Sequence, residues 1–276
     1  MTRLAFLKRT LALVALAALF GPASEADTKL DAGYLPPGDF DPGKALELVF
    51  PGLETKGNVV LWEVPEKEVD PARAKPAWGL IKLEVLDSLT FRQGDAERTF
   101  LVFQSVPAEQ EYNCRNFCAP EVGAATFTKT EEGWRLDALN WVMGRAGGGG
   151  KAPKPELVKL GPERYGVELW SMGVGQGSTV QTDTYFLEAG PSVKEVLRIT
   201  AYSDNGGSCG CEREDCDPDD PDLVTCFEIA STVEFVPGKN AEIFDLKVMH
   251  IDRLDDTFRG VTLYSYTDGM YRETSP

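Results

Sequence analysis

The sequence predicts a mostly β protein, in which antiparallel hairpins form a sandwich or an irregular propeller-like β domain, with one short N-terminal helix. Three observations lead to this fold class. Apolar and polar residues alternate along many short segments, turn sequences rich in Gly and Asp separate these segments, and a single stretch has the apolar spacing of a helix. No fixed-period repeat is present in the sequence, which argues against a regular propeller.

The expected helix begins after Asp41, whose short polar side chain suits an N-cap, and Pro42 fits the first helical turn. Its apolar stripe consists of Leu46, Val49 and Phe50. Pro51 and Gly52 end the helix. We interpret the stripe as a packing surface, because it lies on one side of a short amphipathic helix.

About a dozen strands are expected from alternation and turn signals. They cover residues 59–64, 81–85, 99–106, 122–128, 134–142, 165–172, 182–188, 193–203, 227–235, 244–250, 261–266 and 270–273. Turns at Gln93-Gly94-Asp95, at Glu131-Glu132-Gly133 and at Asp268-Gly269 join neighbouring strands into hairpins. The only histidine, His250, continues the apolar face of its strand, so we interpret it as the polar end of a core strand.

Residues 1–26 have the order of a secretory signal peptide. A positively charged start is followed by an uncharged apolar run at 10–20, too short to span a bilayer, and then by small residues that suit cleavage. We therefore expect a periplasmic or secreted protein with no membrane span after signal cleavage. Residues 27–40 look like a flexible leader, and residues 41–276 like one disulfide-linked β domain. A Gly-rich stretch leaves open a subdivision of that domain near 146–155.

Six cysteines in an exported chain indicate disulfides rather than a zinc or redox site. Cys114 and Cys118 are close enough in sequence to pair with each other. Cys209 and Cys211 are too close to do so without strain, which leaves two arrangements for the second cluster. Either Cys209 pairs with Cys216 and Cys211 with Cys226, or Cys209 pairs with Cys226 and Cys211 with Cys216.

The charge balance restricts the partners. The chain has 44 acidic and 28 basic residues, a net charge of −16. Because such a chain repels phosphate groups, we expect neither nucleic-acid binding nor binding to an anionic membrane surface. A basic protein or envelope component is the favoured partner.

The segment 204–226 contains seven carboxylates between Cys209 and Cys226, opposed only by Arg213. Calcium is a candidate cofactor there, because alternating carboxylates supply the hard oxygen ligands that this ion prefers. The candidate ligands are Asp215, Asp217, Asp219 and Asp222. An EF-hand pattern fails at Asp220, where glycine is required, and again at its last position. A solvated acidic loop held by disulfides is therefore the preferred interpretation, and no other cofactor is expected.

Catalytic signals are sparse. One histidine, no Gly-x-Ser-x-Gly motif and cysteines expected to be oxidised disfavour nucleophilic catalysis, so no catalytic residue is assigned. Carboxylate pairs could serve a glycosidase, but the sequence does not select two that converge. Aromatic residues could form a binding platform or complete a core edge. They are Trp134, Trp141, Trp170, Tyr264, Tyr266 and Tyr271.

These observations favour a non-enzymatic exported β protein that binds a protein or cell-envelope component, as an inhibitor or immunity-like module does. The alternative is a carboxylate-dependent envelope hydrolase, with calcium assisting. A concave pocket with converging titratable groups would favour the enzyme, and a flat or looped surface would favour the binding module.

Overall fold

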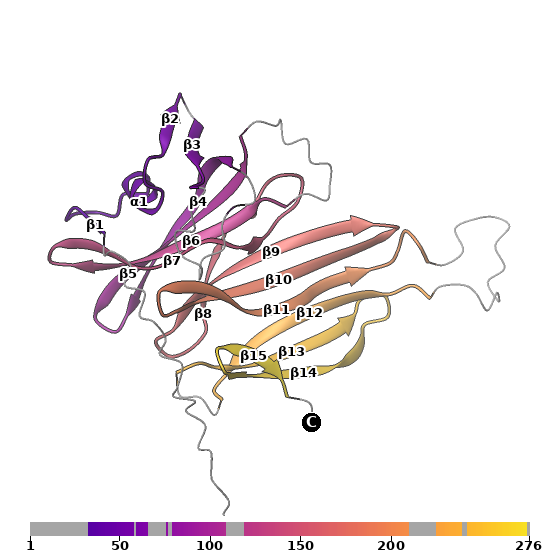
Figure 1. Ribbon diagram of the computed structural model, residues 1–276. Coiled ribbons are helices and arrows are strands. Elements are labelled where there is room, and N and C mark those ends of the chain that lie inside the picture. Colours follow the sequence, from indigo (N-terminus) through magenta and orange to yellow (C-terminus); the bar gives the residue numbers. More distant parts are fainter. Residues whose placement is uncertain are drawn as a thin grey trace, which may run out of the picture.

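The computed structural model describes residues 33–57, 59–65, 76, 79–108, 119–209, 225–238 and 242–274. Two antiparallel sheets and one short helix make up this part of the chain (Figure 1). The predicted fold class is confirmed in its sandwich form. The expected signal peptide lies outside the described residues. No helix in the described ranges is long and apolar enough to cross a membrane.

The first sheet, sheet A, has seven strands in the order β1-β7-β6-β5-β4-β3-β2. The strands are β1 (Tyr34–Leu35), β2 (Glu54–Lys56), β3 (Val59–Glu63), β4 (Leu80–Gln93), β5 (Ala96–Pro107), β6 (Glu121–Thr130) and β7 (Gly133–Arg145). The predicted turns at Gly94 and Gly133 join β4 to β5 and β6 to β7, and both glycines have positive φ. These two hairpins form the centre of sheet A.

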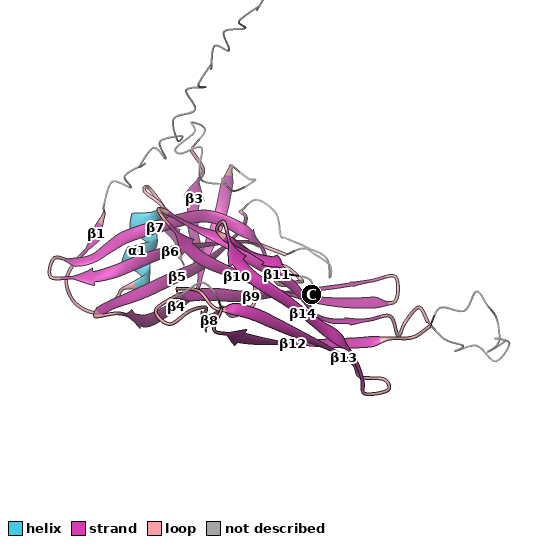
Figure 2. Cartoon of the chain, turned by 90° about the horizontal axis from the view of Figure 1, so that it is seen from below, coloured by secondary structure: helices cyan, strands magenta, loops and turns pink. Residues whose placement is uncertain are grey.

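The second sheet, sheet B, has eight strands, each paired with its neighbours in sequence. They are β8 (Glu156–Lys159), β9 (Tyr165–Gly175), β10 (Ser178–Ala189), β11 (Ser192–Asp204), β12 (Glu228–Val236), β13 (Asp245–Asp252), β14 (Thr257–Thr267) and β15 (Met270–Glu273). In Figures 1 and 2 the end of sheet B that carries the β11–β12 connection projects away from sheet A. Residues at this projecting end therefore have no cover from sheet A.

Helix α1 (Pro42–Val49) covers the outer face of sheet A. The Asp41 side chain accepts hydrogen bonds from the backbone N–H groups of Gly43 and Lys44, which confirms the predicted N-cap. Phe50 packs edge-on against Trp62 and Phe103. The helix thus buries one aromatic cluster on the face of sheet A that sheet B does not cover.

A second core fills the space between the sheets. It joins Phe100 and Val102 of β5 to Val167 and Phe186 of sheet B. Because sheet B covers one face of sheet A and α1 covers the other, the middle of β5 is buried on both faces. Its nearly continuous apolar sequence follows from this two-sided burial.

A third core lies inside sheet B itself. β11 and β12 pair over only three residues, Tyr202–Asp204 with Glu228–Ala230, and then diverge. The gap between them is filled by apolar side chains, among them Tyr185, whose ring packs edge-on against Phe235. Sheet B is therefore continuous from β11 to β12 only at its projecting end.

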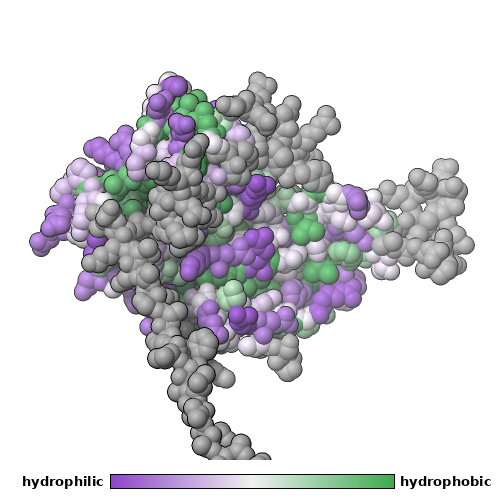
Figure 3. Space-filling model, viewed as in Figure 1, coloured by the Kyte–Doolittle hydropathy of each residue, from purple (hydrophilic) through white to green (hydrophobic). Residues whose placement is uncertain are grey.

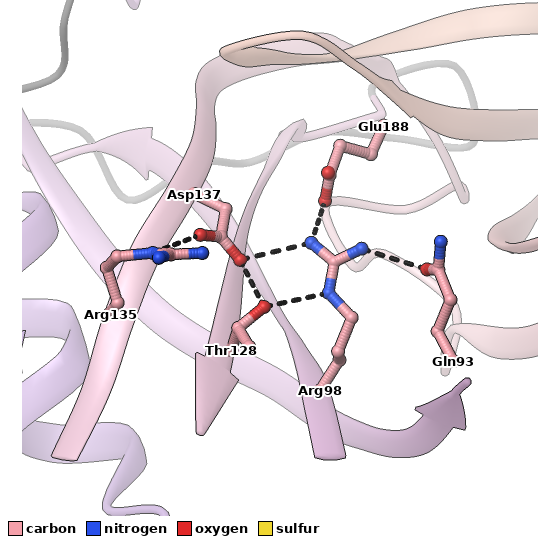
Figure 4. Close-up of polar contacts among 6 residues, drawn as sticks. All are labelled: Gln93, Arg98, Thr128, Arg135, Asp137 and Glu188. Carbon is pink, nitrogen blue, oxygen red and sulfur yellow. Dashed lines mark hydrogen bonds and ion pairs between the residues drawn. The ribbon is translucent and has the colours of Figure 1, made fainter. Parts of the chain in front are cut away.

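A polar network fastens the two sheets together (Figure 4). Arg98 of β5 bonds to Asp137 of β7 at 3.1 Å and to Glu188 of β10 at 2.6 Å through Nη2. Its Nη1 and Nε donate to Gln93 and Thr128. All three guanidinium nitrogens are thus engaged, and the group bridges sheet A and sheet B.

The expected leader and the Gly-rich stretch both make specific contacts in their described residues. Leu35, within the expected leader, is buried in β1, and Trp134 Nε1 donates to the carbonyl of Gly38. In the Gly-rich stretch near 146–155, the N–H of Gly147 donates to the carbonyl of Trp170. The N–H of Ala152 donates to the side chain of Gln104. The connection between the sheets is therefore hydrogen-bonded to both of them.

Candidate binding face

Exposed apolar side chains are concentrated on sheet B. Among the described residues, all the large apolar side chains classed as exposed, except Tyr34, belong to sheet B or its turns. Figure 3 shows apolar surface over the projecting part of this sheet, among mostly hydrophilic residues. A folded chain rarely leaves such side chains clustered in water unless they contact a partner.

Strand register places three of these exposed residues, Met172, Ile251 and Phe258, in one row across the sheet. Each residue of the row lies directly opposite the next across β9 to β14. The row is Met172, Gln181, Tyr202, Ala230, Ile251 and Phe258. Side chains of directly opposed residues point to the same side of a sheet, so this row defines one face, which we call the six-strand face.

Neighbouring rows extend the six-strand face on both sides. Trp170 and Val174 flank Met172 along β9 and are 38% and 43% exposed. Val261 of β14 lies opposite Met249 of β13, which is two residues from Ile251 and points to the same side of the sheet. Since neighbouring strands rotate by roughly 20–25° relative to each other, this broad apolar surface is saddle-shaped rather than flat.

Acidic residues border the six-strand face. Asp204 and Glu228 lie opposite each other, one step from the row toward the β11–β12 connection. Asp183 pairs with Trp170 and borders the row on its other flank, two residues from Gln181 along β10. The face thus combines an apolar middle with an acidic border along β9 to β12, an arrangement common to protein interfaces with apolar centres and charged rims.

The carboxylates near Trp170 have perturbed titration. Burial, together with repulsion from Asp183, raises the pKa of Glu168 to about 7. Tyr185 Oη donates to Glu168 Oε1 at 3.3 Å, which acts in the opposite direction. Burial also raises the pKa of Asp183. In the described part of the chain no Lys or Arg forms an ion pair with either carboxylate, so an incoming cation would relieve their repulsion.

His250 lies between two hydroxyl groups, which is not the arrangement of a catalytic triad. Ser231 Oγ is 2.9 Å from its Nδ1, and Thr262 Oγ1 is 3.2 Å from its Nε2. In a serine hydrolase one ring nitrogen of the histidine faces the serine and the other faces a carboxylate, whereas the other nitrogen of His250 faces the hydroxyl of Thr262. His250 follows Leu246 and Val248 on the core side of β13, as its strand pattern predicts.

The predicted metal residues and most of the predicted cysteines lie outside the described residues. These are Asp215, Asp217, Asp219, Asp222, Cys114, Cys118, Cys211 and Cys216. The structure does describe the two ends of the acidic segment 204–226, up to Cys209 and again from Thr225. Cys209 and Cys226 form a disulfide, as in the second of the two expected arrangements, and Asn205 bonds to the backbone of Thr225 and of Phe227. The acidic segment is therefore attached at the projecting end of sheet B.

A shallow hollow of about 270 Å³ opens on sheet A. It is lined by Val59, Lys82, Leu83, Glu84, Gln104 and Val106. Its only carboxylate, Glu84, accepts a hydrogen bond from Gln104. The hollow therefore lacks the pair of carboxylates that a glycosidase needs.

Of the aromatic residues considered from the sequence, only Trp170 belongs to the six-strand face. Trp134, Trp141 and Tyr271 are buried, and Tyr264 and Tyr266 pack against the core of sheet B. The sequence marks Trp170 only as one aromatic in a strand. Its partners across the sheet depend on strand register, which the sequence pattern does not show.

Comparisons of the chain with protein-family models, with curated proteins and with solved structures gave no match.

Proposed function

We propose that this chain is an exported, non-enzymatic binding module that docks a basic protein partner on the six-strand face of sheet B. The observation that carries the proposal is the row from Met172 to Phe258. The row spans six strands at the end of the sheet that sheet A leaves uncovered, and its members Met172, Ile251 and Phe258 are exposed apolar side chains. Apolar surface of this kind is typical of a protein interface.

Charge selects the class of partner. The chain has a net charge of −16, and acidic residues border the six-strand face. The carboxylates of Glu168 and Asp183 have no cationic partner in the described residues. A basic surface would therefore gain attraction at the rim and apolar contact at the centre.

The Cys209–Cys226 disulfide supports the exported location, because disulfides persist mainly in oxidising compartments. It also joins the two ends of a strongly acidic segment of the sequence. An inhibitor or immunity-like module would use such charge to steer a basic partner toward the apolar centre.

The test is capture of partners from an envelope extract with three versions of the immobilised chain. These are the unaltered chain, Phe258→Asp on the six-strand face, and Val180→Ser on the opposite face. We expect a basic partner that Val180→Ser retains, that Phe258→Asp loses, and that raised salt releases. Equal capture by all three versions would rule out the proposed face.

The rival function is the carboxylate-dependent hydrolase, and one observation favours it. Glu168 has a pKa near 7, which suits a general acid, and it lies near Asp183 and Trp170. Against it, Trp170 and its neighbours lie on an open face rather than in a cleft. Release of reducing sugar from envelope polysaccharide by the chain, abolished by Glu168→Gln, would favour the hydrolase.

A further inference from the structure

Strand β9 is longer than the strand that borders it. β8 pairs only with Tyr165–Glu168, and Gly147 forms a bridge to Ser171 just beyond. Past Ser171, no described residue pairs with β9 on this side, while β10 pairs with it on the other side as far as Gly175. The stretch from Met172 to Gly175 is therefore an open sheet edge.

The direction of the backbone groups on this edge follows from one hydrogen bond. The carbonyl of Trp170 accepts from the N–H of Gly147, so it points away from β10. Backbone groups of successive residues in a strand point alternately to its two sides. Met172 and Val174 therefore direct their N–H and C=O groups toward the open side, where a further strand would bind them.

The edge lacks the features by which proteins protect exposed strands. Residues 172–175 read Met-Gly-Val-Gly, without charge or proline, and the pairing of β9 with β10 has no bulge. The terminal strands of both sheets are by contrast only two to four residues long. Native proteins usually shorten, charge or bulge such edges, so an unprotected one is a pairing site.

Side chains on and near the edge indicate what would pair with it. Trp170, Met172 and Val174 are exposed on the six-strand face. The β9–β10 hairpin, residues 165–189, carries three carboxylates and no Lys, Arg or His. A segment that combines apolar side chains with Lys or Arg would match both properties.

We infer that an extended segment of a protein partner, with apolar residues alternating with Lys or Arg, adds as a strand to sheet B beside Met172–Gly175. This inference rests on the proposed function and specifies how the partner binds. Main-chain hydrogen bonds supply affinity in such strand addition, and alternate side chains supply specificity. A second copy is the less favourable occupant, since two hairpins without any basic residue would then lie side by side.

The probe is a short peptide in which Lys and Val alternate, titrated into the ¹⁵N-labelled full chain. The matched control peptide has the same side chains but is methylated on alternate backbone nitrogens, which removes donors without changing charge. We expect slower amide exchange at Met172 and Val174 with the first peptide, and binding of the methylated peptide weaker by about tenfold. Equal binding of the two peptides, or unchanged exchange at these amides, would overturn strand addition.

A substitution separates this inference from the proposed function. Met172→Pro removes an N–H that points to the open side, so the hydrogen bonds between β9 and β10 remain. Val174→Pro serves the same purpose if the first variant does not fold. We expect either variant to abolish peptide binding and capture of the basic partner. Capture that survives Met172→Pro but is lost with Phe258→Asp would refute strand addition and leave the proposed face standing.

Discussion

Phe258 of β14 lies directly opposite Ile251 of β13, and both side chains are exposed, Phe258 to 63% and Ile251 to 38%. A register shift between His250 and Ile251 sets this pairing, and Gly260 in the bulge has φ +134°. Because the bulge reverses the alternation of β14, Phe258 joins Val261 on the six-strand face. The bulge thus turns a large apolar side chain toward water, which is costly unless a partner covers it.

The double variant Ile251→Thr/Phe258→Thr should leave folding almost unchanged and reduce partner binding. Both side chains are exposed, so their loss should change the free energy of unfolding by no more than about 1 kcal/mol. Threonine keeps good strand propensity at both positions. Urea unfolding checks stability, and capture of the basic partner checks binding.

Phe100→Ala is the matched core control. Phe100 is 1% exposed between the sheets, so truncation should cost about 3–5 kcal/mol. A loss of similar size for the Ile251/Phe258 double variant would mean that the six-strand face is a structural surface rather than a binding one.

Stability should depend on pH through Glu168. Burial raises its pKa from the ordinary value of 4.5 to about 7, with Asp183 contributing, so the folded chain holds this proton at pH values where the unfolded chain has lost it. The free energy of unfolding should therefore fall as pH rises from about 4.5 toward 7 and then level off. Because water screens this partly exposed group, the contribution is on the order of 1 kcal/mol.

Melting curves between pH 5 and pH 8, at about half-unit steps, measure this effect. Glu168→Gln should flatten that part of the profile and raise the melting temperature near pH 8. Glu131→Gln, in the exposed β6–β7 turn, is the control and should follow the unaltered chain. An unaltered profile for Glu168→Gln would show that this carboxylate is ionised in the folded chain throughout the range.

The local features of the fold could be predicted from sequence. The Asp41 cap, the turns at Gly94, Gly133 and Gly269 and the long hairpins are determined by neighbouring residues, and all are found. The short strands β1, β2 and β8 are not predicted. β1 shows why, since it pairs with Arg135 and Trp134 about a hundred residues later and has no pattern of its own.

The six-strand face could not be predicted, because it depends on strand register and on two bulges. One bulge lies near Tyr202, where the pairing shifts between Gln181 and Thr182, and the other lies before Phe258. Each reverses which side chains point to the face. The sequence shows alternation within a strand, but a bulge changes the alternation by one residue without a distinctive residue type.

The Cys209–Cys226 disulfide should be found by peptide mapping of the non-reduced chain. Its closed loop has a sequence separation of 17, for which the loop-entropy relation gives about 3 kcal/mol of stabilisation. The double variant Cys209→Ser/Cys226→Ser should lose about that amount in urea unfolding. Cross-linked peptides joining Cys209 to Cys216 would contradict the structure.

Arg98→Met should destabilise the chain more than any substitution of a surface ion pair. Arg98 is nearly buried and bonds to Asp137 and Glu188, so its removal leaves Asp137 with Arg135 alone and takes from Glu188 its cation at the junction of the sheets. Breaking a buried pair in this way typically costs about 3–5 kcal/mol. Methionine keeps most of the side-chain volume, so the loss should come from charge rather than from a cavity.

Lys247→Met is the matched control for this charge effect. Lys247 pairs with Glu234 at 3.4 Å on the exposed surface of sheet B, where an ion pair contributes about 0–1 kcal/mol. Urea unfolding of both variants therefore compares the same substitution in a buried and an exposed pair. If the two losses were equal, the Arg98 network would not be what fastens sheet A to sheet B, and the remaining contacts, among them the apolar core around Phe100 and the Asn140–Val193 hydrogen bond, would hold the sheets together.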